Sequence, residues 1–197
     1  MDYSLQQADC YLRDLTLEDA SLTFKWRQLS RAKYLNAGAS SVADQETWIK
    51  AQPSQDYNMV ICLSSGEPVG TISLTNIDVT KKIGMSGRFL IGEDQLCEGK
   101  PIAFEAMLLL YELAFVKLGL NQVFGFINKD NKLMIKWQKV MGMNEIDNDD
   151  LHFYSLKPDP ENVFLCIDRH SFEHVYLTKI KSYINVLKKK SSKVTGR

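Results

Sequence analysis

The hydrophobic and polar positions follow two different periods, which predicts a chain that mixes strands and helices along its length. Short apolar runs with strand-like spacing cover residues 11–15, 59–63, 69–77, 83–91, 123–127, 151–156 and 163–167. Apolar positions with helical spacing cover residues 17–29, 41–52, 101–118, 132–141 and 172–187. Because turn residues join the early strands as hairpins, we expect an α+β fold (an α/β sandwich) with a mixed, mostly antiparallel sheet flanked by helices.

Two of the predicted helices differ in how much of their surface is apolar. The helix 101–118 is apolar on almost every side and ends at Gly119, so we expect it to be buried centrally. The helix 172–187 has one apolar face, which packs either on the domain or on a second copy, so that a homodimer is an open alternative. We therefore expect one domain over residues 1–170, followed by an amphipathic helix and a basic tail over residues 171–197.

Composition narrows the class of protein. The chain has 197 residues, of which 45% are hydrophobic, enough for one sizeable core. No apolar run reaches the roughly 18 residues of a membrane span, and the polar N-terminus does not resemble a secretory signal. The four cysteines and three histidines lack the spacing of metal ligands. We expect a cytoplasmic protein with free thiols, no metal and no membrane span.

The charge of the chain is balanced but unevenly distributed. Lys and Arg number 24, as do Asp and Glu, while residues 179–197 carry seven basic residues and no acidic one. We interpret this tail as a solvated helix end rather than a nucleic-acid site. Contact with nucleic acid or an anionic membrane is the weaker alternative.

A glycine-lysine loop precedes the central helix. Gly99, Lys100 and Pro101 open this helix, whose free N–H groups and dipole would favour a phosphate. Six residues separate Gly92 from Gly99, and Pro101 follows the lysine, so the loop is not a Walker motif. An ordinary helix start is the alternative interpretation.

Three stretches occur in an order that points to one family. They are YLRDLTLEDASLTFKWRQ from residue 11, FLIGEDQLCEGKPIAFEAMLLLYELAF from residue 89, and NKDNKLMIKWQKVMGM from residue 128. Together they resemble the GNAT superfamily of acetyl-CoA-dependent N-acetyltransferases, over residues 11–167. The resemblance is greatest to the branch of ribosomal-protein N-terminal and bacterial amino-sugar acetyltransferases. The run LHFYSL from residue 151 is similar to a strand of the amino-sugar members.

This resemblance implies a fold in which two central strands, at residues 86–91 and 123–127, splay apart to admit acetyl-CoA. The pantetheine arm would pair with the backbone of Leu90, Ile91 and Gly92. The pyrophosphate would lie on Glu98, Gly99, Lys100, Pro101, Ile102 and Ala103. Asn131 would contact the pantetheine arm, and Met134, Lys136 and Gln138 would line the cosubstrate.

The sequence departs from the family pattern at three positions. Pro101 replaces the central glycine of the pyrophosphate loop, which removes one N–H donor. Gln138 stands where many members place a tyrosine that protonates the departing thiolate. Ser86 stands where some relatives have a glutamate that acts as general base.

Acyl transfer to an amine requires that the protonated amine first loses a proton. We expect this proton to leave through His152 directly, or through Ser86 and Asn76 by way of water. A structural histidine on a strand is the alternative for His152. Trp26, Arg27, Asn76 and Arg88 are candidates for the acceptor side. Arg88 would suit a phosphate or carboxylate, with a surface ion pair as the alternative.

We therefore expect an N-acetyltransferase that moves acetyl from acetyl-CoA to a primary amine by direct attack in a ternary complex. The acceptor would be a small-molecule amine or a peptide amine: an amino sugar first, a protein N-terminus second, and an antibiotic or polyamine third. The alternative from another class is a catalytically degenerate GNAT domain that binds CoA as a sensor or scaffold.

Overall fold

The computed structural model describes residues 5–194, and the side chains of residues 5–190. The first four residues of the polar N-terminal stretch and Arg197 of the basic tail lie outside the described residues. None of the described helices is both long enough and apolar enough to cross a membrane.

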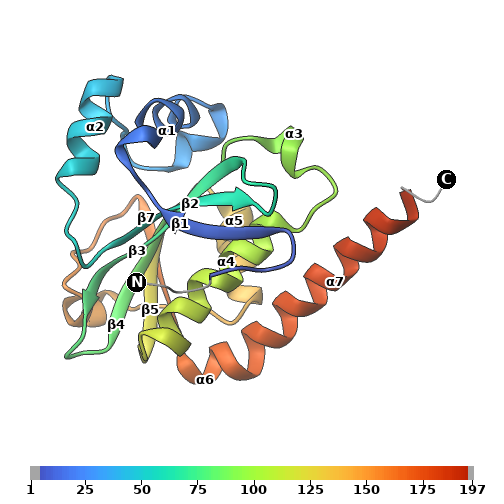
Figure 1. Ribbon diagram of the computed structural model, residues 1–197. Coiled ribbons are helices and arrows are strands. Elements are labelled where there is room, and N and C mark those ends of the chain that lie inside the picture. The colour runs from blue at the N-terminus through green and yellow to red at the C-terminus, as the bar shows by residue number, and fades with distance from the viewer. Residues whose placement is uncertain (1–4, 195–197) are drawn as a thin grey trace.

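A twisted sheet forms the middle layer of the molecule (Figure 1). In spatial order its strands are β1 (Cys10–Asp14), β2 (Tyr57–Leu63), β3 (Pro68–Asp78), β4 (Ile83–Ile91), β5 (Gln122–Asn128), β7 (Asn162–Asp168) and β6 (Asn144–Glu145). Neighbouring strands are antiparallel except β4 and β5, which run parallel. The expected mixed, mostly antiparallel sheet flanked by helices is confirmed.

Helices cover both faces of this sheet. One face carries α1 (Ala20–Arg27), whose Trp26 packs on Leu90, and α2 (Val42–Lys50), which contacts α1. The other face carries α4 (Ile102–Glu112), α5 (Lys132–Val140) and α7 (Leu177–Val194), together with the main hydrophobic core. The short helix α3 (Asp94–Cys97) leads from β4 to α4. As expected, α4 is buried, because its own apolar side chains point to nearly every side of the helix.

The two parallel strands separate after a short ladder. Pairing between β4 and β5 covers three positions, from Ile83 with Gln122 to Met85 with Phe124. Beyond Met85, β4 stays with β3 and β5 stays with β7, so a wedge opens between them. This geometry confirms the expected splay of the two central strands.

A β-bulge lies on the open side of this wedge. Between the pairs Ser73–Gly87 and Thr71–Leu90, β3 has one residue and β4 has two, Arg88 and Phe89. Arg88 has a φ of 52°, which is uncommon for a residue other than glycine. The bulge therefore turns the Arg88 side chain out of the regular alternation of the strand.

The strand expected at residues 151–156 is wrong. Residues Asn148–Tyr154 form a 3-10 helix, η4, and Ser155 ends it in the left-handed region with a φ of 58°. Only Leu151 of this helix is buried. The polar run that precedes Leu151 favours a helical turn, and this local preference outweighs the strand-like spacing of the residues after it.

The C-terminal helices begin earlier and continue further than the spacing predicted. Helix α6 (Arg169–Ser171) follows the N-cap residue Asp168, whose side chain accepts the Ser171 N–H at 2.7 Å. A π-helical turn, η5 (Phe172–Tyr176), then leads into α7. Tyr176 packs edge-on against Tyr111 of α4, with ring centroids 4.6 Å apart. The segment from Phe172 to Ile184 thus packs on the same core, while a domain division after residue 170 remains a prediction.

Candidate active site

The wedge between β4 and β5 contains a cavity of about 290 Å³. Ser86 to Ile91 line one side of it, and Gly125 to Asn128 line the other. Helix α4 contributes Met107, Leu110 and Tyr111, and α5 contributes Met134 and Gln138. The cavity therefore joins both splayed strands to the two helices on the core face of the sheet.

The closed end of this cavity lies where the strands meet. The Ser86 hydroxyl donates to the Phe124 carbonyl at 3.4 Å. A Cβ on Gly125 would lie 3.0 Å from the Ser86 backbone oxygen, so only glycine fits without a shift of the strands. Ser86, proposed from the sequence as part of a proton route, thus lies at the point where the splay begins.

Tyr111 is a functional candidate that sequence reasoning missed. Its side chain is fully buried, lines the cavity, and donates to the Met143 sulfur at 3.8 Å. Burial raises the pKa of Tyr111 to about 12, and the Ser86 side chain acts in the opposite direction. The one available signal was a phenol within an otherwise aliphatic run of the central helix. This phenol stays protonated at neutral pH and can donate a hydrogen bond.

Helix α5 forms the opposite wall through residues that the sequence identified. The Asn131 side chain caps this helix by accepting the Met134 N–H at 3.3 Å. Gln138 is buried, and its Oε1 has no hydrogen-bond partner among the described residues. An unpaired buried acceptor beside a cavity suits a ligand that brings an N–H or O–H group. The residues present therefore fit an amide-bearing ligand such as pantetheine.

The expected pyrophosphate loop lies outside the lining of this cavity. Glu98 to Ala103 form the turn between α3 and the first residues of α4, with Gly99 at a φ of 73°. Lys100 is exposed, and Pro101 takes the N-cap position without a side-chain hydrogen bond. Lys136 is also exposed and lies outside the lining.

Trp26 supports the end of β4 and the residues that lead into α3 from the other face of the sheet. It is buried, and its indole N–H donates to Glu93 at 2.8 Å. A Cβ on Gly92 would lie 2.3 Å from the indole ring, so the backbone there needs glycine. Gly92 therefore packs against Trp26, and it is not among the residues that line the wedge.

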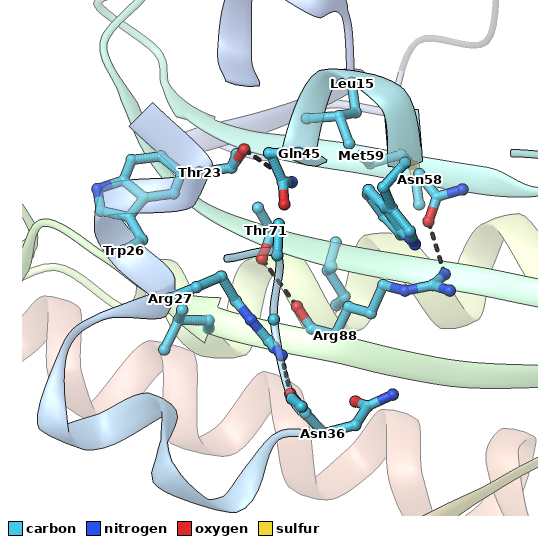
Figure 2. A pocket seen from close by; sticks show the side chains of 16 residues that line it. Leu15, Thr23, Trp26, Arg27, Asn36, Gln45, Asn58, Met59, Thr71 and Arg88 are labelled. Atoms are coloured by element: carbon cyan, nitrogen blue, oxygen red, sulfur yellow. Dashed lines mark hydrogen bonds between the residues drawn. The ribbon is translucent and has the colours of Figure 1, made fainter. Parts of the chain in front are cut away.

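A second, smaller cavity of about 120 Å³ lies on the α1 and α2 face of the sheet (Figure 2). Trp26 and Arg27 line it from α1, and Gln45 and Trp48 line it from α2. It shares Ile72, Arg88 and Leu90 with the wedge cavity. The two cavities therefore share lining residues at the bulge of β4, and the structure brings Trp26, Arg27 and Arg88 to the smaller one.

Arg88 and Arg27 are held in this second cavity by uncharged groups. Arg88 donates to the Asn58 side chain at 2.7 Å and lies 5.0 Å from the centre of the Trp48 ring. Arg27 donates to the Asn36 carbonyl. Burial lowers the pKa of each guanidinium, and the charge of Arg88 lowers the pKa of Arg27 further. Both side chains still carry a positive charge at neutral pH.

Asn76 and His152 are not brought to either cavity. Asn76 lies near the end of β3 with a φ of 50°, and its backbone N–H donates to Asp56 at 3.0 Å. His152 is exposed on η4, and its Nδ1 lies 2.6 Å from the Asp149 carbonyl. It lines a separate surface cavity with Tyr154 and Arg169. Their proposed roles in proton transfer and acceptor binding remain predictions.

Comparison with known proteins identifies the class. Residues 10–144 match the model of the acetyltransferase (GNAT) domain, and the chain belongs to this family. A search of curated proteins finds no match to the chain.

Three solved structures share the fold at low sequence identity. The apo form of FdhC, a nucleotide-linked sugar GNAT, is 21% identical, with a TM-score of 0.73 over 91% of this chain and 97% of that chain. A GCN5-related N-acetyltransferase from Brucella melitensis is 14% identical, with a TM-score of 0.70 over 91% of this chain and 84% of that one. A chimera of spermidine N-acetyltransferase SpeG from Vibrio cholerae and hSSAT is 12% identical, with a TM-score of 0.68 over 85% and 99%.

Proposed function

We propose that the protein transfers acetyl from acetyl-CoA to a primary amine by direct attack within a ternary complex. The observation that carries this proposal is the junction of the two cavities at the bulge of β4, where both are lined by Ile72, Arg88 and Leu90. A cosubstrate in the wedge and an acceptor in the smaller cavity would approach each other from opposite faces of one strand. Holding both reactants in contact removes the need for a covalent acetyl-enzyme.

In this proposal the wedge holds the acyl donor. Leu90 and Ile91 offer backbone groups along the open strand, Gly92 continues the strand beyond the wedge lining, and Asn131, Met134 and Gln138 face the strand from α5. The unpaired Oε1 of Gln138 accepts an N–H of the pantetheine arm. The uncapped start of α4, with Glu98 to Ala103, receives the pyrophosphate. The placement of Lys136 beside the cosubstrate stays a prediction, because this exposed side chain lies outside the wedge lining.

The chemistry then rests on groups along β4, from Ser86 at the closed end of the wedge to Leu90 beyond the bulge, and on Tyr111 of α4. A backbone N–H near Leu90 polarises the thioester carbonyl, and the amine proton leaves through water beside Ser86. The attacking nitrogen bonds to the carbonyl carbon, and the carbon–sulfur bond breaks. Because Gln138 cannot act as an acid, the Tyr111 hydroxyl stabilises the departing thiolate by donating a hydrogen bond.

An amino sugar is the first acceptor class to test and a protein N-terminus is the second. The test is the release of free thiol from acetyl-CoA with amino sugars, peptides and polyamines, together with calorimetric titration of CoA. Turnover with one class would support the proposal. If CoA binds and no amine of any class releases thiol, the protein would instead be a CoA-binding sensor or scaffold, which Gln138 in the tyrosine position favours.

A further inference from the structure

The charged groups that line the smaller cavity, on the α1 and α2 face, are all positive. The cavity contains two guanidinium groups, the amides of Asn36, Gln45 and Asn58, and the hydroxyls of Thr23 and Thr71. None of the described residues that line it is an aspartate or a glutamate. A cavity of this composition attracts an anion and repels a second cation.

The two arginines of this cavity lack the carboxylate partners that three other arginines have. Arg13 pairs with Asp19, Arg31 with Asp94, and Arg169 with Glu173. Neither Arg27 nor Arg88 forms an ion pair with a carboxylate of the described residues.

The nearest acidic influence on Arg88 does not neutralise it. The charge of Asp56 raises the pKa of Arg88, yet burial lowers this pKa by more. A carboxylate oxygen of Asp56 instead accepts the Asn76 backbone N–H at 3.0 Å. Two partly buried cations therefore face one cavity without a counter-charge, an arrangement that costs free energy unless an anion binds there.

The geometry of the cavity fixes both cations in place before any ligand arrives. Arg88 leaves the bulge towards Asn58 of β2 and the Trp48 ring of α2, which hold it. Arg27 extends from α1 and donates to the Asn36 carbonyl (Figure 2). Guanidinium groups present several parallel N–H donors that match the oxygens of a phosphate or carboxylate. Pre-ordered donors bind more tightly, since less side-chain entropy is lost on binding.

We infer that this cavity is an oxyanion site for the acceptor, so that the amine substrate carries a phosphate or carboxylate held between Arg27 and Arg88. This inference rests on the proposed acetyl transfer, and it names the substrate class of the same site. Because the cavity meets the wedge at Arg88 and Leu90, an acceptor anchored there places its amine towards the acyl donor. A neighbouring surface cavity shares Leu15, Asn58 and Met59 and leaves room for the rest of a larger acceptor.

The experiment compares amines that differ in one anionic group. Glucosamine 6-phosphate is paired with glucosamine, and phenylalanine is paired with phenylalanine amide, with spermidine as a polycation. Thiol release is measured for the wild type, Arg27→Gln, Arg88→Gln and the control Lys50→Gln, which changes an exposed lysine at the end of α2. We expect the anionic member of one pair to have the larger kcat/KM by about 10- to 100-fold, as for charge-assisted hydrogen bonds. The pair that shows this preference identifies phosphate or carboxylate.

The arginine variants should lose this preference through a higher KM for the anionic amine, and Lys50→Gln should keep it. Arg88→Lys keeps the charge and should recover part of the preference, which separates loss of the site from loss of the fold. Turnover of neutral amines or spermidine as efficiently as anionic ones would overturn the oxyanion site while leaving acetyl transfer intact.

Calorimetry with glucosamine 6-phosphate and phenylalanine gives a second readout that does not depend on turnover. Binding that both Gln variants abolish, without thiol release from any amine, would support the oxyanion site and refute the proposed acetyl transfer. The absence of both binding and turnover with either anionic amine would refute the oxyanion site.

Discussion

The two cavities on either side of β4 are built on different principles. The wedge is lined mostly by strand backbone and apolar side chains, and its few buried polar groups include Tyr111 and Gln138. The smaller cavity combines two arginines, amides and hydroxyls with apolar side chains such as Trp26 and Met59, and it shares Arg88 with the wedge. The wedge thus offers general features for a ligand with a long arm, whereas the smaller cavity places two positive charges at its wall. If the wedge holds the donor and the smaller cavity the acceptor, as we propose, backbone geometry would recognise the donor and side chains the acceptor.

Reversal of the charge at Arg88 should produce the largest effect, and mainly on the acceptor. Arg88→Glu places a carboxylate where we expect the anionic group of the acceptor, so kcat/KM for that amine should fall at least about 100-fold. Arg88 also lines the wedge, but the contacts of α5 are unchanged, so the dissociation constant of CoA, measured by calorimetry, should rise by less than about tenfold. Equal loss of CoA binding would show that the two cavities are not separate recognition sites.

Removal of one hydroxyl at the closed end of the wedge should affect the chemical step. Tyr111→Phe deletes a donor whose present partner is the weak contact to the Met143 sulfur, so the melting temperature should change little. We expect kcat to fall by between about 10- and 100-fold, as when a hydrogen bond to a developing negative charge is lost. Both KM values should be unchanged.

The protonation state of the Tyr111 phenol should not change with pH in the usual assay range. Because the pKa of Tyr111 is raised to about 12, it stays protonated from pH 6 to pH 10. Its raised pKa stabilises the fold below the unfolded value of about 10, and this contribution is lost as pH rises towards 12. A fall in wild-type kcat between pH 8 and pH 10 that is absent in Tyr111→Phe would contradict this assignment.

A charge reversal at the start of α4 should act on the donor alone. Lys100 is exposed, so its contribution to a bound pyrophosphate is screened by water. Lys100→Glu should weaken CoA binding about tenfold, because one favourable charge interaction is replaced by an unfavourable one. The KM for the amine should not change. Lys139→Glu, on the outer side of α5, provides a control of equal charge change.

The sequence predicted the wedge better than the smaller cavity, for a physical reason. The splay of β4 and β5 was expected from the family resemblance, whereas the Asn131 cap and the end of α5 near Gly142 depend on local spacing and on residues with restricted backbone preferences. Such signals can be read along one segment of the chain.

The acceptor side depends on the meeting of distant segments. Arg27 and Arg88 were both expected on that side, but their shared cavity and the absence of a carboxylate partner follow from how α1 packs on the bulge. Tyr111 was missed because α4 is apolar almost all round, so the spacing does not show which of its faces meets the wedge. Asn76 was expected beside the acceptor, yet its left-handed backbone and its bond to Asp56 hold it near the far end of β3.

Substitution of His152 should have the smallest effect on catalysis, because this residue lies on the surface outside both cavities. A strand at residues 151–156 would have placed His152 on the sheet. Instead, His152 lies on η4, where its ring is exposed in a third cavity and its Nδ1 contacts the Asp149 carbonyl. Because neither Ser86 nor Arg88 lines that cavity, His152→Ala should change kcat/KM less than about twofold, as for most surface substitutions. The pH profile of kcat should be retained. A flattened profile in His152→Ala would instead place proton transfer at η4 and would remove Ser86 from the proposed route.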